Sequence, residues 1–597
     1  MIKVSDYVSK FLFEAGLRRV FLVTGGGAMH LNDSFVRYRP FQVTFNHHEQ
    51  ACAMAAEGLF RSTGEVGIVN VTTGPGGLNT LTGLHGQWTD SIPALYISGQ
   101  VKFETTVASC PELGLRQLGD QEVDIIRVVK PLTKFAECVT DPNSIRKVLE
   151  RALHEATTGR MGPVWVDIPM NVQGALIDET SLVGAELVSP ESPPLDVWPV
   201  LAALAKSKRP VVVAGHGVAL SRTRKELLDF LDQCRVPVVT TFNGFDLIPS
   251  DHPCFCGRIG TLGTRGGNFT LQNADFVLFL GTRNNIRQIT YNWGGYANRA
   301  VTVGVDIDLA ELEKPTFQPD IKIHSDLSRF LPALVRAYAD GERGDWLDWL
   351  NWAKERERKY PGSRKDHYDE KDRIHPYAFM ETWTRTLSSE AVVVAGNGTA
   401  CVALFQAGIV KTGQRMFWNS GCASMGYDLP AAIGAAVGTE SVVWCLAGDG
   451  SLQMNIQELA TLGQNQFDVK LIYLNNGGYA SIRQTQRNFF ESQHGCGVDS
   501  GLGFPDMEKL ALAYGIPYRR TARIEQVAEH AAKVLETKGP VIWEVLLKLD
   551  YSFEPKVSSE RLPDGRMISK PLEDMYPFLP REEFEANMYV VSEEVGR

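Results

Sequence analysis

The sequence of 597 residues contains no run of about 18 consecutive apolar residues, the length that a membrane-spanning helix requires. It has no basic excess either, because 60 lysines and arginines face 70 aspartates and glutamates and give a net charge of −10. We therefore expect neither nucleic acid nor a membrane as a partner. The first residues lack the apolar core of a secretory signal peptide, so we expect a cytoplasmic protein.

The ten cysteines also lack the spacing of a disulfide framework or a zinc site. In a chain of this length, scattered cysteines are typical of reduced thiols, which again favours the cytoplasm. The proportions of hydrophobic residues (44%) and charged residues (22%) are those of a globular protein. At about 150 residues per domain, the length predicts three or four domains.

Short apolar, β-branched stretches alternate with helical stretches along the chain, as at 66–71 and 164–168. Strands of this kind lie in parallel sheets that are buried on both faces. We therefore predict an α/β fold of three doubly wound parallel-sheet domains and a C-terminal tail. A segment rich in Glu, Ser and Pro follows the first domain. The predicted divisions are 1–178, 190–340, 370–550 and the tail 551–597.

Two glycine-containing motifs in the third block predict a site for a diphosphate. Residues 448–451 read GDGS and residues 475–478 read NNGG, each after a predicted strand, with a single helix expected at 452–464. Because carboxyl ends of neighbouring parallel strands meet, Asp449 and Asn476 would lie together, where open α/β sheets bind ligands. Mg²⁺ prefers a few such protein oxygens together with phosphate oxygens. Taken separately, each motif would be an ordinary turn after a strand.

Two segments of the first block carry a second set of candidates. Glu49 precedes an Ala-rich helix at 51–60, and taken alone it is a first-turn glutamate that stabilises a helix N-terminus. Residues 72–79 read TTGPGGLN and follow a predicted strand. A Gly-Pro-Gly turn by itself is weak evidence, because glycine and proline mark turns in most proteins.

Together, these motifs resemble the thiamine diphosphate-dependent enzymes. The resemblance is strongest to the acetolactate synthase branch, in which residues 448–459, GDGSLQMNIQEL, read almost the same. It implies a pyrimidine-binding, a central nucleotide-binding-like and a diphosphate-binding domain, in that order. It also implies that Asp449, Asn476 and the carbonyl of Gly478 bind Mg²⁺. Glu49 would be the catalytic carboxylate, which holds a ring nitrogen of the aminopyrimidine and promotes the imine that accepts the thiazolium proton.

The resemblance extends to further cofactor contacts. The residues expected to bind thiamine diphosphate are Gly76, Asn79, Asn397, Gly398, Thr399, Ser424, Met425, Gly448, Gly450, Ser451, Gly478 and Tyr479. Met425 resembles the apolar wedge that bends the cofactor, although it could also be an ordinary core residue. The central domain of this branch often binds FAD, while other relatives bind ADP or nothing there, and FAD is our first expectation. The residues at matching places are Arg160, Gly215, Thr241, Gly263, Gly281, Arg283, Asp306 and Asp326.

Three positions depart from the acetolactate synthases. Thr485 stands where they have a Trp that selects the acceptor, and Asp120 stands where they have a Phe before Gln121. Met170 replaces a Lys. Arg287, by contrast, matches the arginine that meets the carboxylate of the second keto acid. The exchange of apolar for polar residues at Thr485 and Asp120 predicts a more polar acceptor than pyruvate or 2-oxobutyrate.

Further candidates for the catalytic site also lie in the first block. Gly26 and His30 belong to a glycine-rich loop that would face the thiazolium, and Gln121 belongs to the segment that would lie over it. His30 is either an acid–base group or a structural hydrogen-bonding residue. Asp120 is either a proton-transfer group or an ordinary acid of a surface loop.

The expected function is that of a carboligase that uses thiamine diphosphate and Mg²⁺. A 2-oxo acid, pyruvate in first place, would lose CO₂, and the remaining acyl carbanion would be transferred to a carbonyl acceptor. The alternatives are a lyase or hydrolase for a 2-hydroxyacyl thioester or a cyclic diketone, and a non-catalytic scaffold. In this family the Glu and the metal site come from different chains, which implies a homodimer or a tetramer. A regulatory subunit stays an open question, and the tail is expected to fold over the active site.

Overall fold

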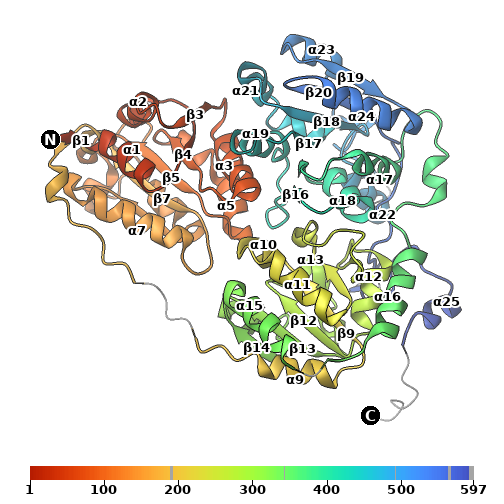
Figure 1. Ribbon diagram of the computed structural model, residues 1–597. Coiled ribbons are helices and arrows are strands. Elements are labelled where there is room, and N and C mark those ends of the chain that lie inside the picture. Colours follow the sequence, from red (N-terminus) through yellow and green to blue (C-terminus); the bar gives the residue numbers. More distant parts are fainter. Residues whose placement is uncertain (189–192, 342, 491, 562–565, 590–597) are drawn as a thin grey trace.

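The computed structural model describes residues 1–188, 193–341, 343–490, 492–561 and 566–589, which form three α/β lobes (Figure 1). Each lobe contains a six-stranded sheet in which every pairing is parallel. The first sheet has the order β3 (Gln42–Phe45), β2 (Arg19–Leu22), β4 (Ile68–Val71), β5 (Leu95–Gln100), β7 (Val164–Pro169) and β6 (Phe135–Cys138). The predicted strands 66–71 and 164–168 correspond to β4 and β7.

The sheet of the third lobe repeats the topology of the first. Its order is β16 (Arg415–Phe417), β15 (Val392–Ala395), β17 (Val443–Gly448), β18 (Val469–Asn475), β20 (Val541–Leu546) and β19 (Tyr518–Thr521). The central sheet differs, because its strands run outward on both sides from the pair β9 and β12. Its order is β11 (Phe255–Arg258), β10 (Val238–Thr240), β9 (Pro210–Ala214), β12 (Phe276–Leu280), β13 (Val301–Asp306) and β14 (Ile321–His324).

The composition of the strands explains why they lie in the interior. All five residues of β12, FVLFL, are buried, which is the pattern of a parallel strand covered by helices on both faces. The predicted α/β fold of three doubly wound parallel sheets is thus confirmed. The predicted domain limits stay a prediction, and residues 190–192 at the start of the second one lie outside the described residues.

The first and third lobes pack against each other through two helices rich in small residues, α3 (Glu49–Thr63) and α19 (Asp428–Gly438), as Figure 1 shows. Their backbones approach so closely that a Cβ atom at Gly58 would lie 2.0 Å from the carbonyl oxygen of Ala431. A single hydrophobic core, including Met54 and Leu429, continues across this contact. The two lobes are therefore joined by direct helix packing.

The tail packs on the central lobe. Asn268 in α12 (Arg265–Gln272) donates a hydrogen bond to the carbonyl of Leu572 at 3.0 Å. Phe584, in the short helix α25 (Arg581–Ala586), lies 6.1 Å from the ring of Phe269. Apolar residues of this part of the tail therefore pack against α12. The expectation that the tail folds over the active site stays a prediction. Residues 562–565 and 590–597 of the predicted tail lie outside the described residues.

Within the described ranges, none of the helices combines the length and the apolar character that crossing a bilayer would require.

Candidate active site

The strands β17 and β18 bring Asp449 and Asn476 together. They are neighbours in the third sheet, with Gly448 opposite Leu474, so that the residues following both strands emerge at the same edge. Asp449 is 2% exposed and Asn476 is 3% exposed. The Asp449 carboxylate accepts hydrogen bonds from the backbone N–H groups of Gly450 and Gly478, both at 2.8 Å. This burial raises the pKa of Asp449 to about 6, and the N–H groups oppose the effect.

The amide of Asn476 lies between two sets of oxygen atoms. One terminal atom is 2.7 Å from the carbonyl oxygen of Gly478 and 3.2 Å from Oδ2 of Asp449. The other is 2.7 Å from Oη of Tyr551 and 3.2 Å from Oγ1 of Thr399. When the amide oxygen occupies the first position, three oxygens face one another without a proton between them. When the amide is turned over, its NH₂ group donates to the carbonyl oxygen of Gly478 and to Oδ2 of Asp449 instead.

These spacings fit a divalent cation. Mg²⁺ binds oxygens at about 2.1 Å in octahedral geometry, so adjacent ligands lie about 3 Å apart. The amide oxygen of Asn476 has this spacing from the oxygens of Gly478 and Asp449, and a cation would compensate the buried charge. The described residues hold no cluster of three or more His, Cys, Asp or Glu side chains suited to a metal, so this set relies on amide and backbone oxygens.

The chain after Asp449 corrects one prediction. In place of one helix at 452–464, the structure has α20 (Asp449–Gln453) and α21 (Glu458–Asn465). Between them, Asn455 donates to the carbonyl of Gly426 at 2.7 Å and to Oε1 of Gln50 at 2.9 Å. Glu458 accepts the backbone N–H of His47 at 2.9 Å. The helix breaks because these side chains bind partners in the first lobe and in another loop.

Other predicted cofactor-binding residues gather at the same sheet edge. Asn397, after β15, donates to the carbonyl of Ser424 at 2.7 Å and so fastens the loop that carries Met425. The hydroxyl of Ser451 accepts the backbone N–H of Gly426 at 2.9 Å. Gly450 lies against the ring of Tyr479, where a Cβ atom would be 1.8 Å from a ring carbon. Gly398 and Thr399 begin the adjoining helix α18 (Thr399–Ala407).

A second group of predicted residues surrounds Glu49 in the first lobe. Glu49 is the first residue of α3, and its Oε2 accepts a hydrogen bond from Asn79 at 2.9 Å. A Cβ atom at Gly76 would lie 3.7 Å from its Oε1. The backbone oxygen of Gln121 lies on the Gly-Pro-Gly turn, because a Cβ atom at Gly74 would be 1.9 Å from it. The structure thus brings Glu49, Gly76, Asn79 and the Gln121 segment together.

Three other candidate residues of this lobe are Asp120, Gly26 and His30. Asp120 is exposed, next to Gln121. Gly26 lies in a short 3₁₀ turn, as expected for a loop. His30 was predicted on that loop, but it lies in the first turn of α2 (Met29–Arg37), and a Cβ atom at Gly174 would be 3.2 Å from its Nε2. Asn32 of the same helix accepts the N–H of Gly25 at 3.1 Å and so holds the loop against the helix.

The two groups remain separate in one chain. No hydrogen bond or ion pair among the described residues joins Glu49 to Asp449 or Asn476. The neighbouring residue Gln50 does reach Asn455, between α20 and α21. Of the predicted substrate residues, Thr485 is exposed on α22 (Ala480–Phe490), and Arg287 in α13 (Ile286–Ile289) lies 5.2 Å from the ring of Phe242.

A cavity of 310 Å³ lies between the first and central lobes, at the carboxyl ends of β9 and β12 where the strand order reverses. Open α/β sheets bind ligands at this position. The cavity is lined by five of the residues predicted for a nucleotide, namely Arg160, Gly281, Arg283, Asp306 and Asp326. Thr241 lines a separate pocket of 50 Å³ together with Arg287. Gly215 and Gly263 line neither of these two pockets; a Cβ atom at Gly215 would be 2.4 Å from the carbonyl oxygen of Gly281.

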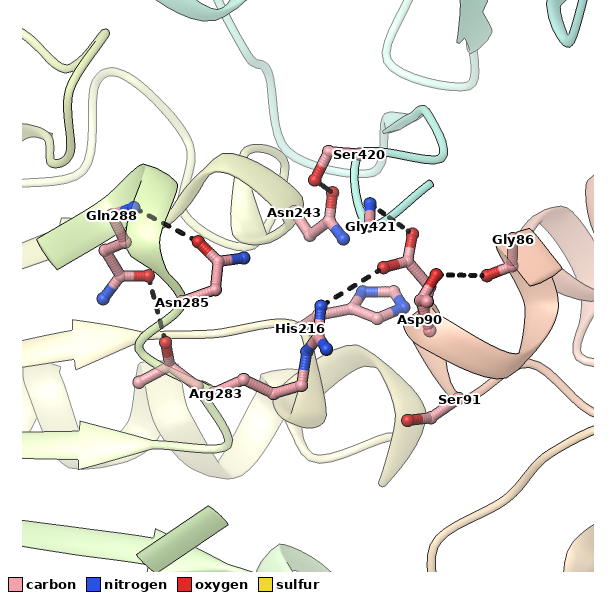
Figure 2. A network of polar contacts seen from close by, with 12 residues as sticks. Gly86, Asp90, Ser91, His216, Asn243, Arg283, Asn285, Gln288, Ser420 and Gly421 are labelled. Carbon is pink, nitrogen blue, oxygen red and sulfur yellow. Dashed lines mark hydrogen bonds and ion pairs between the residues drawn. The ribbon is translucent and has the colours of Figure 1, made fainter. Parts of the chain in front are cut away.

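Sequence reasoning missed several residues near these sites. Asp90 and His216 line the larger cavity, and Figure 2 shows them with Arg283, which pairs with Asp90 at 3.9 Å. Burial and the guanidinium groups of Arg61 and Arg415 hold the pKa of His216 well below its usual range. No spacing in the sequence marks these residues, because the contact joins separate lobes. Tyr551 was assigned only to the tail.

Comparison with known proteins agrees with this arrangement. Three models of the thiamine pyrophosphate enzymes match the chain: the N-terminal TPP binding domain at 2–127, the central domain at 198–334 and the C-terminal TPP binding domain at 396–545. Acetolactate synthase 1, chloroplastic, of Zea mays is 31% identical over 576 residues, which cover 93% of this chain and 87% of that one. The chain belongs to the thiamine pyrophosphate enzyme family.

Two bacterial acetolactate synthases are similar to this chain over nearly its whole length. The acetolactate synthase large subunit of Lactococcus lactis subsp. lactis (strain IL1403) is 30% identical, covering 91% of this chain and 92% of its own. The acetolactate synthase isozyme 2 large subunit of Escherichia coli (strain K12) is also 30% identical, covering 91% of this chain and 95% of its own. Within the family, the protein is therefore an acetolactate synthase-like enzyme that depends on thiamine diphosphate. The resemblance stated from GDGSLQMNIQEL is confirmed.

Proposed function

We propose that the protein is a carboligase that uses thiamine diphosphate and Mg²⁺, removes CO₂ from a 2-oxo acid and joins the remaining acyl unit to a carbonyl acceptor. Pyruvate is the proposed donor. The observation that carries this proposal is the convergence of oxygens from Asp449, Asn476 and Gly478 at the edge of the third sheet. When bound, thiamine diphosphate supplies the carbanion chemistry.

The residues of the third lobe bind and orient the cofactor. Asp449, Asn476 and the carbonyl of Gly478 would hold Mg²⁺, which would supply positive charge against the diphosphate. The backbone of 448–451 and the start of α18 hold the diphosphate oxygens, because N–H groups beside glycines can approach an anion closely. Met425, on the loop that Asn397 fastens, would give the cofactor an apolar contact.

Glu49 would hold and move the proton that the cofactor's chemistry requires. Its carboxylate would bind the aminopyrimidine of thiamine diphosphate, and the hydrogen bond from Asn79 orients that carboxylate. Because Glu49 and the metal-binding residues form separate groups within one chain, we propose that Glu49 of one copy faces Asp449 of a second. The active form is then a homodimer or a tetramer. A regulatory subunit is not part of the proposal, and the proposed location is the cytoplasm.

The acceptor is proposed to be more polar than pyruvate, such as an aldehyde or a keto sugar. The support is the polar character of Asp120 in the first lobe and of Thr485 in the third, both of which are exposed in the single chain. Arg287 would bind an anionic group of this substrate. The 310 Å³ cavity beside Arg160 and Asp306 is proposed to bind a nucleotide, FAD in first place or ADP.

The test is to incubate the purified protein with thiamine diphosphate, Mg²⁺, FAD and pyruvate alone, and to follow CO₂ together with the products. Acetolactate would make it a synthase despite Thr485. Slow release of acetaldehyde or acetoin would identify pyruvate as donor and leave the acceptor to be found by screening aldehydes and sugars. An absence of CO₂ from pyruvate and other 2-oxo acids would overturn the carboligase in favour of the lyase or hydrolase reaction.

A further inference from the structure

Tyr551 lies at the metal-binding residues although it belongs to the segment that follows the last strand of the third sheet. Its Oη is 2.7 Å from the terminal amide atom of Asn476 that points away from Asp449. The same hydroxyl forms a hydrogen bond with Thr399. Tyr551 therefore contacts the side of Asn476 that cannot face a cation.

The orientation of the Asn476 amide decides whether the metal-binding set is complete. Its two ends are nearly the same in shape, so the hydrogen-bonding partners determine which end faces which side. The amide oxygen can join Asp449 and Gly478 only if Nδ2 points at Tyr551 and Thr399. Each of those hydroxyl oxygens can accept a hydrogen bond from Nδ2.

We propose that Tyr551 is a positioning residue, which accepts a hydrogen bond from Nδ2 of Asn476 and keeps the amide oxygen turned toward Mg²⁺. This inference rests on the proposed metal site. Partners of metal ligands in other proteins act in the same way, and their loss typically weakens metal binding about 10- to 100-fold.

The segment that carries Tyr551 is fastened by contacts other than its hydroxyl. Arg483 donates to the carbonyls of Asn476 and Leu549, both at 2.8 Å, and so ties the metal loop to the start of the segment. Beyond Tyr551, the backbone N–H of Glu554 donates to Oη of Tyr377 at 3.0 Å. A hydroxyl on a backbone held at both ends can orient a neighbouring side chain.

The experiment is a calorimetric titration of the intact protein, saturated with thiamine diphosphate, with Mg²⁺. Tyr551→Phe is expected to bind Mg²⁺ about 10- to 100-fold more weakly than the natural protein. Tyr377→Phe is the matched control, because it removes a buried hydroxyl that fastens the same segment without touching a metal ligand. It is expected to bind Mg²⁺ as the natural protein does.

A second comparison separates orientation from simple packing. In Asn476→Asp both terminal atoms are oxygens, so an oxygen faces the metal position in either orientation of the side chain. Tyr551→Phe should therefore weaken Mg²⁺ binding less in the Asn476→Asp protein than in the natural one. Equal losses in both backgrounds, or an equal loss in Tyr377→Phe, would overturn the positioning role.

Asp449→Asn distinguishes failure of this inference from failure of the proposed metal site. If Asp449→Asn binds Mg²⁺ as tightly as the natural protein, the metal site itself is wrong. If Asp449→Asn loses Mg²⁺ binding while Tyr551→Phe retains full affinity, only the role of Tyr551 is wrong. Circular dichroism of each variant confirms that the compared proteins are folded.

Discussion

Gly434 of α19 and Ala55 of α3 touch through their backbones, although they belong to different lobes. A Cβ atom at Gly434 would lie 1.8 Å from the carbonyl oxygen of Ala55. No atom can occupy that position, so the two helices can approach this closely only because the residue is glycine. The contact fixes the first lobe, with Glu49 at the start of α3, against the third lobe.

Gly434→Ala should destabilise the protein. In an exposed helix this change stabilises by about 1 kcal/mol, because alanine is the better helix former. Here the added methyl group must push the helices apart, which costs about 1–3 kcal/mol or more. Urea unfolding measures the difference. Gly294→Ala is the control, because a Cβ atom there has no neighbour within 4 Å. Equal stability of the two variants would show that the helix contact can relax.

Glu49→Gln should lose turnover and keep the fold. Glutamine retains an oxygen for the hydrogen bond from Asn79, but it lacks the charge and cannot transfer a proton. Proton transfer by a positioned side chain contributes roughly 10²- to 10⁴-fold in rate, so CO₂ release should fall by at least that range. Glu65→Gln, which alters a partner of Arg19 in the same lobe whose side chain is 20% exposed, should retain activity. A fully active Glu49→Gln protein would contradict the proposed mechanism.

The sequence predicted the elements whose signals are local. The buried strands, the GDGS and NNGG motifs after β17 and β18, and a helix close to Glu49 all follow from short patterns, although α3 begins at Glu49 and not at the predicted residue 51. It failed where the partner is distant in the chain. The break between α20 and α21 depends on Asn455 contacting Gln50, and Glu458 contacting His47, about 400 residues away.

The same reason explains the missed site residues. No sequence pattern sets Tyr551 apart from the other tyrosines of the tail, because its hydroxyl meets Asn476 and Thr399 only after folding. Asp90 and His216 come together because the first and central lobes pack side by side. No spacing along a single sequence encodes such contacts, because they depend on how finished lobes dock.

His375→Asn should make the protein less sensitive to acid. His367 and His375 stack with ring centroids 3.8 Å apart, and burial lowers their pKa values to about 4 and about 3. As the pH falls below about 6.5, these two histidines become protonated in the unfolded chain and stay neutral in the folded one. The contribution of these histidines to the folding free energy is therefore fully present above that pH. It is lost as the pH falls toward 4, by up to about 1.4 kcal/mol per pH unit for each histidine.

Asparagine removes one of these groups and keeps the helix cap. Nδ1 of His375 accepts the N–H of Tyr377 at 3.3 Å at the start of α17 (Pro376–Thr386), and asparagine is a good N-cap residue. The measurement is the melting temperature at pH 7 and pH 5, whose difference should shrink in His375→Asn. Replacing the exposed His85 by Asn should leave that difference unchanged. An unaltered difference in His375→Asn would assign the acid sensitivity to other groups.

Met575→Ala tests what the tail does. Met575 is fully buried, and its sulfur lies 3.2 Å from Nδ2 of Asn268 in α12. Truncating a buried methionine to alanine costs about 2–5 kcal/mol, so the melting temperature should fall clearly. Phe578→Ala, at a position 45% exposed, should have a small effect. If Met575→Ala instead lost turnover at unchanged stability, this part of the tail would act at the active site, as the sequence predicted for the tail.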